Sequence, residues 1–388
     1  MKRILFALSL MAATTASFAQ VAKPMEDVNK VIDNTADSLN KAMTARIQPG
    51  TSRRGNNPVL FLIGNSTMRN GTLGNGNNGQ WGWGYYEHEF FDASKITVEN
   101  QALGGMSSRT FYNRLWPDVR KGIKAGDWVI ISIGHNDNGP YDSGRARASI
   151  PGIGKDSLNV TIKETGVKET VYTYGEYMRK YINDCKALGA HPILMSLTPR
   201  DAYDENDKIV RVNKTFGLWA KQVAEQEHVP FVDLNEISAA KLDSYGHWKE
   251  KYHFFKDHIH TSRFGAMMNA RSAAEGLAES KDPNLAPLQA MMSNVALPTE
   301  NFKREPGKPV VFFTGDSTVK NADKDEDGMW GWASQAYTIF NPKKITCVNA
   351  AKAGRSSRSY LNEGRWDKVY NSLQPGDYVL IEFGHNDI

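Results

Sequence analysis

The chain lacks several features that would place it outside the ordinary globular proteins. Only Cys185 and Cys347 occur among its 388 residues, which excludes a disulfide framework and leaves stability to a hydrophobic core. A single disulfide bond between these two cysteines stays open as an interpretation. The alternative is that both are buried thiols without a chemical role. The formal charge is only +4, of which Lys2 and Arg3 supply two units, so no nucleic-acid partner is indicated. Nor does the N-terminal apolar run reach the roughly 20 residues of a membrane span, so no integral membrane segment is expected.

The first 19 residues have the pattern of a secretory signal peptide. Lys2 and Arg3 precede the apolar run 4–13, and Ser17-Phe18-Ala19 forms a small-x-small cleavage site. No cysteine follows the cleavage site, so a lipid anchor is not expected there. The sequence therefore predicts an exported protein, periplasmic or extracellular.

Three segments of the chain occur twice. VLFLIGNST (59–67) returns as VVFFTGDST (310–318), NQALGGMSSRTF (100–111) as NAAKAGRSSRSY (349–360), and WVIISIGHND (128–137) as YVLIEFGHND (378–387). A period this long predicts duplicated domains rather than a solenoid. Because the chain stops directly after the third match, we expect the second copy to be incomplete. Either the sequence is a fragment or truncated reading frame, or a half-domain packs on the first copy.

Composition divides the chain into five parts. We expect a signal peptide at 1–19, an N-terminal helix and linker at 20–58, a first domain at 59–281, a proline-rich linker at 282–308 and the incomplete second copy at 309–388.

Within the first domain, short β-rich runs alternate with helical patterns. Strands are expected at 59–63, 96–100, 128–133, 192–196 and 231–233, and helices at 81–91, 108–125, 174–188, 212–228 and 262–279. This rhythm predicts an α/β fold, a three-layer α/β/α flavodoxin-like sandwich with a parallel five-stranded sheet. The long segment 138–173 interrupts it and predicts a binding loop with a small hairpin.

Polar residues that could carry chemistry follow the predicted strands. Ser66 lies in a small-residue turn that would expose its hydroxyl, which needs a base to act as a nucleophile. Asp257 and His260 could supply the orienting acid and that base if their loop reaches Ser66. Gly105 and Asn136, with the N–H of Ser66, could donate to an oxyanion.

Simpler interpretations of these residues stay open. Gly-Asn-Ser-Thr alone is a turn, and Asp257 and His260 alone could be a helix cap and a surface residue. The cluster of His253, Asp257, His258 and His260 could instead bind a metal, but no partner ligands elsewhere are evident. We therefore expect no metal and no cofactor.

Together, Ser66, Gly105, Asn136 and His260 resemble the four blocks of the SGNH (GDSL) hydrolases. Three stretches, GMSSRTF (105–111), GHND (134–137) and DHIHTS (257–262), most resemble the rhamnogalacturonan acetylesterase branch. The resemblance implies a triad of Ser66, His260 and Asp257, an oxyanion hole of Ser66, Gly105 and Asn136, and deacetylation of galacturonate in pectic rhamnogalacturonan.

The two copies depart from the family pattern in different ways. In the first, Asn65 stands where the family usually has Asp, whereas the second keeps Asp316. The second copy retains Ser317, Gly354 and Asn386 but has no Asp-x-x-His, so it lacks a base.

Three further residues are candidates for substrate binding. Arg145 and Arg147, in the 138–173 segment, could meet substrate carboxylates, with a solvated loop as the alternative. Trp83, in a Trp-Gly-Trp motif that both copies contain, could stack on a sugar ring, with core packing as the alternative. Two other functions stay open, namely an esterase of another acetylated glycan such as xylan and a non-catalytic carbohydrate-binding protein. The oligomeric state is left open as well.

Overall fold

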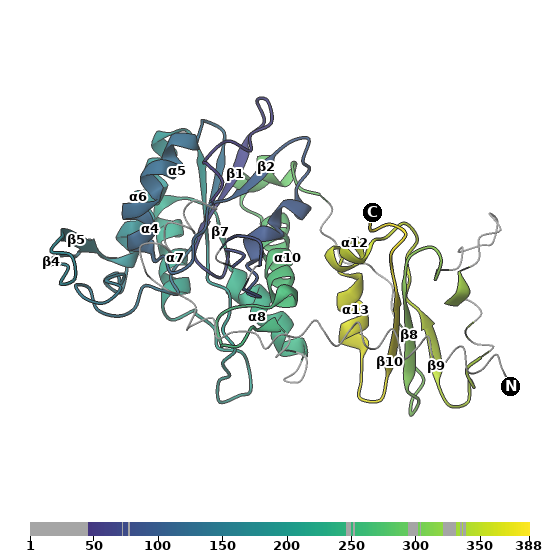
Figure 1. Cartoon of the computed structure of the whole chain (residues 1–388). Helices are drawn as coiled ribbons and strands as arrows, with labels where there is room; N and C mark the ends of the chain where they lie inside the picture. The colour runs from purple at the N-terminus through teal and green to yellow at the C-terminus, as the bar shows by residue number, and fades with distance from the viewer. Residues whose placement is uncertain are drawn as a thin grey trace.

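The computed structural model describes residues 46–71, 73–76, 78–245, 250, 253–293, 302, 304–320, 331–333, 336 and 339–388. The predicted signal peptide, and all but the last residues of the predicted N-terminal helix, lie outside these ranges. The described residues form two units, each built on a parallel sheet (Figure 1). None of their helices is both long and apolar enough to cross a membrane.

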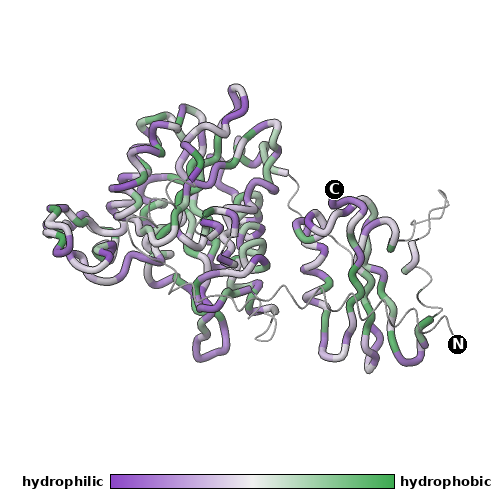
Figure 2. The backbone as a smooth tube through the Cα atoms, in the orientation of Figure 1, coloured by the Kyte–Doolittle hydropathy of each residue, from purple (hydrophilic) through white to green (hydrophobic). Residues whose placement is uncertain are grey.

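The first unit contains the predicted five-stranded parallel sheet. Its strands are β1 (Val59–Gly64), β2 (Thr97–Asn100), β3 (Trp128–Ser132), β6 (His191–Met195) and β7 (Phe231–Val232). They lie in the order β2-β1-β3-β6-β7, which is the flavodoxin-like order. β1 and β3 are buried along their whole length, as expected for parallel strands covered on both faces. Hydrophobic stretches accordingly follow the central strands (Figure 2).

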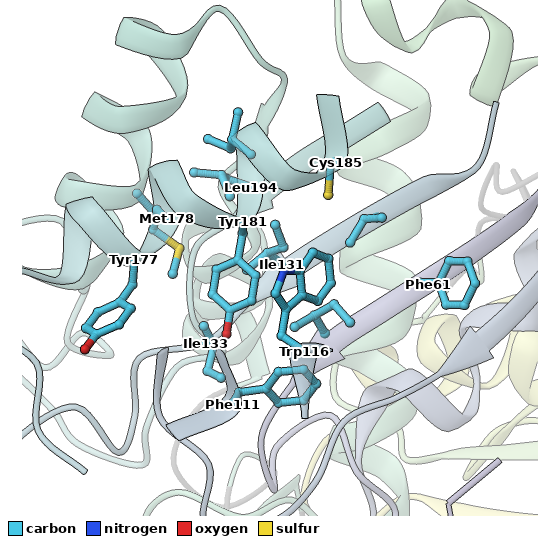
Figure 3. Packing of buried hydrophobic residues seen from close by; sticks show 14 of the residues in the cluster. Phe61, Phe111, Trp116, Ile131, Ile133, Tyr177, Met178, Tyr181, Cys185 and Leu194 are labelled. Atoms are coloured by element: carbon cyan, nitrogen blue, oxygen red, sulfur yellow. The ribbon is translucent and has the colours of Figure 1, made fainter. Parts of the chain in front are cut away.

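Helices cover both faces of this sheet. One face carries α4 (Ser108–Arg114), α5 (Trp116–Gly122), α6 (Tyr174–Ala187) and α7 (Phe216–Glu227). Phe61 and Ile63 point to this face, while Leu60 and Leu62 point to the other. Here Trp116 and Tyr181 meet edge to face, with ring centroids 5.0 Å apart (Figure 3).

The opposite face is covered by η1 (Trp83–Tyr85), η2 (Glu87–Phe90), α10 (Arg263–Glu279) and α11 (Ala286–Gln289), with α8 (Leu234–Tyr245) packed against α10. α11 follows the short turn η4 (Pro283–Leu285). The predicted linker therefore starts too early, because Leu285 and Leu288 are fully buried in this core and residues 282–293 belong to the first unit.

Two predicted helices of the first unit differ from the structure, and two of its helices, α8 and the short α11, were missed. The segment 81–91 forms two 3₁₀ turns instead of one α-helix, because Gly82 packs against backbone; a Cβ there would lie 2.4 Å from the Arg69 carbonyl oxygen. The predicted helix 108–125 breaks between α4 and α5, where Pro117 lies in the first turn of the second helix.

The 138–173 segment contains the predicted antiparallel hairpin, β4 (Ser157–Thr161) with β5 (Lys168–Tyr172), which projects from the first unit (Figure 1). Arg109, fully buried on α4, fixes the segment. Its Nε and Nη2 donate to the two oxygens of Glu169 at 2.7 and 2.9 Å, and its Nη1 donates to the carbonyls of Tyr141 and Ala148. A single buried guanidinium therefore ties both ends of the segment to α4.

The second unit contains β8 (Val310–Gly315), β9 (Thr346–Asn349), β10 (Tyr378–Glu382), α12 (Ser357–Asn362) and α13 (Arg365–Ser372). Its strands lie in the order β10-β8-β9. β10 is largely exposed, with Tyr378 at 60% and Ile381 at 62%. Towards the first unit, Asp367 of α13 pairs with Arg271 of α10 at 3.6 Å.

Candidate active site

Ser66, His260 and Asp257 form one hydrogen-bonded chain at the carboxyl end of the first sheet. The Oγ of Ser66 lies 2.8 Å from Nε2 of His260, and Nδ1 of His260 lies 2.6 Å from Oδ2 of Asp257. Ser66 and His260 are 194 residues apart in the chain, so the fold alone brings them together. Ser66 is 8% exposed and His260 5%, so both side chains are buried but retain some exposed surface.

A tight loop fixes Asp257 and His260 relative to each other. Oδ1 of Asp257 accepts the backbone N–H groups of Ile259 and His260, and the Phe255 N–H donates to the His260 carbonyl. Burial works against ionisation of Asp257, but the hydrogen bonds from His260 together outweigh it and lower the pKa of Asp257 to about 2. The carboxylate is therefore charged at neutral pH and can orient the imidazole ring.

The segment before η1 supports this loop from the other side. The N–H of Trp81 donates to the Thr261 carbonyl, and the Thr261 hydroxyl donates to the Trp81 carbonyl at 2.7 Å. In addition, Nε2 of Gln80 donates to the carbonyl of Ser66 at 2.8 Å. The nucleophile and the base are thus tied to the same short segment.

Ser66 itself lies in a sharp turn directly after β1. Asn65 closes the turn, because its Oδ1 accepts the N–H and the hydroxyl of Thr67, both at 3.0 Å. In the second unit Oδ1 of Asp316 accepts the same two groups of Thr318. Asn65 therefore makes the same two turn contacts that the aspartate makes at the matching position.

The Gly104-Gly105 turn lies beside the nucleophile. A Cβ placed on Gly104 would approach Cβ of Ser66 to 3.8 Å, while one placed on Gly105 would meet nothing within 4 Å. Gly105 has φ +79, which favours glycine. Within the described chain, the N–H groups of Ser66 and Gly105 donate to no other group. Two unpaired amides next to a serine hydroxyl are suited to stabilising an oxyanion.

The strand end after β3 supports this turn. Nδ2 of Asn136 donates one hydrogen to the Met106 carbonyl at 2.9 Å and retains a second. Asp137, buried, accepts the N–H and hydroxyl of Ser108 and the hydroxyl of Ser149. Burial raises the pKa of Asp137 to about 6, although the hydrogen bonds from Ser108 oppose the shift. Asp137 thereby joins the start of α4 to the 138–173 segment.

Sequence reasoning did not identify two residues near this site, His135 and Arg200. His135 is buried, and its Nε2 lies 3.2 Å from the Thr198 hydroxyl; burial, followed by the charges of Arg200 and His260, lowers its pKa to about 3. Arg200 follows β6, and the N–H of the next residue, Asp201, donates to the His258 carbonyl. Its place just after a predicted strand is the signal that could have found it.

The other predicted binding residues lie in different environments. Arg147 is half-buried and donates from Nη1 to the Gly105 carbonyl at 3.3 Å, whereas Arg145 is exposed. Trp83 is 0% exposed and packs in the core beneath η1, so its ring offers no surface for a sugar. Among the described residues, no group of three His, Cys, Asp or Glu is arranged to hold a metal ion. Cys185 and Cys347 are both free thiols.

A parallel α/β sheet that carries a serine, a histidine and a carboxylate in one hydrogen-bonded chain is the arrangement of α/β serine hydrolases. The chain belongs to the GDSL-like lipase/acylhydrolase family, whose model matches residues 60–270. This membership supports a carboxylic ester hydrolase.

Relatives of the chain are found in Emericella nidulans and Bacillus subtilis. A rhamnogalacturonan acetylesterase of Emericella nidulans is 28% identical over 55% of this chain and 81% of its own. The probable rhamnogalacturonan acetylesterase YesY of Bacillus subtilis is 30% identical over 57% of this chain and 92% of its own. The crystal structure of the YxiM protein of Bacillus subtilis aligns over 57% of this chain and 56% of its own, with 27% identity and a TM-score of 0.46.

Proposed function

We propose that the chain is a serine esterase that removes acetyl groups from rhamnogalacturonan, with Ser66 as nucleophile, His260 as base and Asp257 as the orienting acid. The observation that best supports this proposal is the continuous chain of hydrogen bonds from Ser66 through His260 to Asp257, with distances of 2.8 and 2.6 Å. The substrate class rests on the two relatives named for rhamnogalacturonan deacetylation, which match this same unit.

The reaction takes two steps through a covalent intermediate. The Oγ of Ser66 attacks the acetyl carbonyl while Nε2 of His260 takes its proton. The N–H groups of Ser66 and Gly105 and the free hydrogen of Asn136 Nδ2 stabilise the tetrahedral oxyanion. His260 then protonates the departing sugar oxygen, which leaves as the free hydroxyl. In the second step His260 takes a proton from the water that attacks the acetyl-enzyme and returns it to Oγ of Ser66 as acetate leaves.

We also propose that the C-terminal unit is a second copy of the fold of the first unit. Matching contacts support this: Arg53 pairs with Asp127, which accepts the first N–H of β1, just as Arg304 pairs with Asp377, which accepts the first N–H of β8. Gly354 has φ +73, and Nδ2 of Asn386 donates to the Arg355 carbonyl. In the described chain Ser317 has no histidine partner. Export of the protein rests on the pattern of residues 1–19 alone.

Acetate release from acetylated rhamnogalacturonan tests the esterase proposal. Ser66→Ala should lower kcat by several orders of magnitude, because removal of a triad nucleophile leaves only the oxyanion donors and substrate binding. Ser317→Ala, the same change in the second unit, is the matched control and should retain wild-type turnover. Acetylated xylan, assayed in parallel, reports on the breadth of the substrate class. Acetate release by Ser66→Ala at the wild-type rate would refute the assignment.

A further inference from the structure

Two arginines approach the candidate active site from opposite segments. Arg147 comes from the 138–173 segment and donates to the carbonyl of Gly105, the residue whose N–H faces the proposed oxyanion. Arg200 comes from the loop after β6, which is bonded to the catalytic loop through the Asp201 N–H and the His258 carbonyl. One guanidinium therefore stands on the oxyanion side of Ser66 and the other on the His260 side.

Both guanidinium groups are half-buried without an ion-pair partner. Within the described part of the chain, neither Arg147 nor Arg200 forms a salt bridge, and the only hydrogen bond of either side chain is that of Arg147 to the Gly105 carbonyl. Two other arginines with little exposure behave differently, as Arg53 pairs with Asp127 and Arg109 with Glu169. Burial of an unpaired charge is unfavourable, so an anion that reached either guanidinium would gain a preformed partner.

The charges around these arginines leave them available to a ligand. Burial, followed by the charge of Arg145, lowers the pKa of Arg147, whereas the charge of Asp137 opposes the shift. Burial also lowers the pKa of Arg200, against the charge of Asp257. Asp257 is already committed to His260, and Asp137 to Ser108 and Ser149. His135, beside Arg200, is neutral and adds no competing charge.

We propose that Arg147 and Arg200 bind carboxylates of the sugar chain on the two sides of Ser66, and so select uronate-containing substrates over neutral acetylated glycans. A guanidinium recognises a carboxylate through two parallel N–H groups, which fixes orientation as well as charge. The inference rests on the proposed function for the identity of the sugar, since rhamnogalacturonan carries a carboxylate on each galacturonate.

A binding experiment separates this inference from the esterase proposal, because it needs no turnover. The ligands are a deacetylated rhamnogalacturonan oligosaccharide and the same oligosaccharide with its carboxyl groups reduced to alcohols, titrated calorimetrically against the full chain. The wild type should bind the native form at least about tenfold more tightly, since a hydrogen bond to a charged group contributes on that scale. Raised salt should diminish this preference, because part of the attraction is electrostatic.

The variants Arg147→Gln and Arg200→Gln should each reduce that preference by about tenfold. Arg147→Lys and Arg200→Lys keep the charge but lose the planar pair of N–H donors, and they should retain part of the preference for the native oligosaccharide. Arg114→Gln removes the same charge from an exposed arginine of α4 and is the matched control. Circular dichroism verifies that each variant folds.

Equal binding of the two oligosaccharides by the wild type, no binding of the native form, or full discrimination by the Gln variants would each overturn the inference. Acetate release measured on the same proteins reports the other proposal. Discrimination without acetate release would preserve the carboxylate site and remove the esterase, whereas acetate release without discrimination would do the reverse.

Discussion

Arg109 is the side chain whose removal should most clearly separate the 138–173 segment from the rest of the first unit. Arg109→Met keeps an apolar stem of similar length but removes all donors. It leaves the carbonyls of Tyr141 and Ala148 without this donor. The carboxylate of Glu169, which is 24% exposed, loses its ion pair and keeps the hydrogen bond from Asn113. Removal of one member of a buried ion pair costs about 3–5 kcal/mol. We expect Arg109→Met to lower the free energy of unfolding by an amount near the lower end of that range, because water can reach Glu169.

Urea unfolding of the full chain, followed by fluorescence of its nine tryptophans, measures this loss. Arg358→Met is the matched control, because Arg358 occupies the same place in the second SSR motif but is exposed; its cost should stay below about 0.5 kcal/mol. In the double variant Arg109→Met with Glu169→Gln, the loss of unfolding free energy should differ clearly from the sum of the two single losses, because the two side chains are in contact. A loss below about 1 kcal/mol for Arg109→Met, or additive effects in the double variant, would refute the reasoning.

Two further predictions concern the carboxylates of the site. Asp137→Asn tests the pKa of Asp137, which burial raises to about 6. The protonated carboxyl contributes fully to the stability of the fold below about pH 4, its pKa in the unfolded chain. This contribution, about 3 kcal/mol of unfolding free energy, is lost as the pH rises through about 6. The wild type should therefore lose stability relative to Asp137→Asn between these pH values in urea titrations, and a pH-independent difference would contradict the shift. Asp257→Asn should lower kcat for acetate release by about four orders of magnitude, because an amide holds the wrong imidazole tautomer. A loss smaller than tenfold would mean that Asp257 does not orient His260.

The layers of the first unit and the candidate catalytic residues could be predicted from the amino-acid sequence. Apolar runs rich in β-branched residues, alternating with helical patterns, predicted the sheet and its flanking helices, since the period of the hydrophobic pattern is a local property of the chain. Ser66, Gly105, Asn136 and His260 were found because each follows a strand or lies in the loop before a helix, where an α/β fold presents polar groups. The prediction of a helix at 81–91 was wrong because Gly82 packs closely against backbone, which no periodicity reveals.

Only the tertiary structure decided which of these residues meet, and in what environment. It placed Trp83 in the core, assigned residues 282–293 to the first unit, and set the guanidinium of Arg109 against Glu169. It also set Arg147 and Arg200 beside the candidate site, although they lie 53 positions apart in the chain. The physical reason is that burial and pairing depend on chain segments that fold together from distant positions. The sequence does not reveal whether a charged side chain is solvated, forms an ion pair, or is left unpaired and available to a ligand.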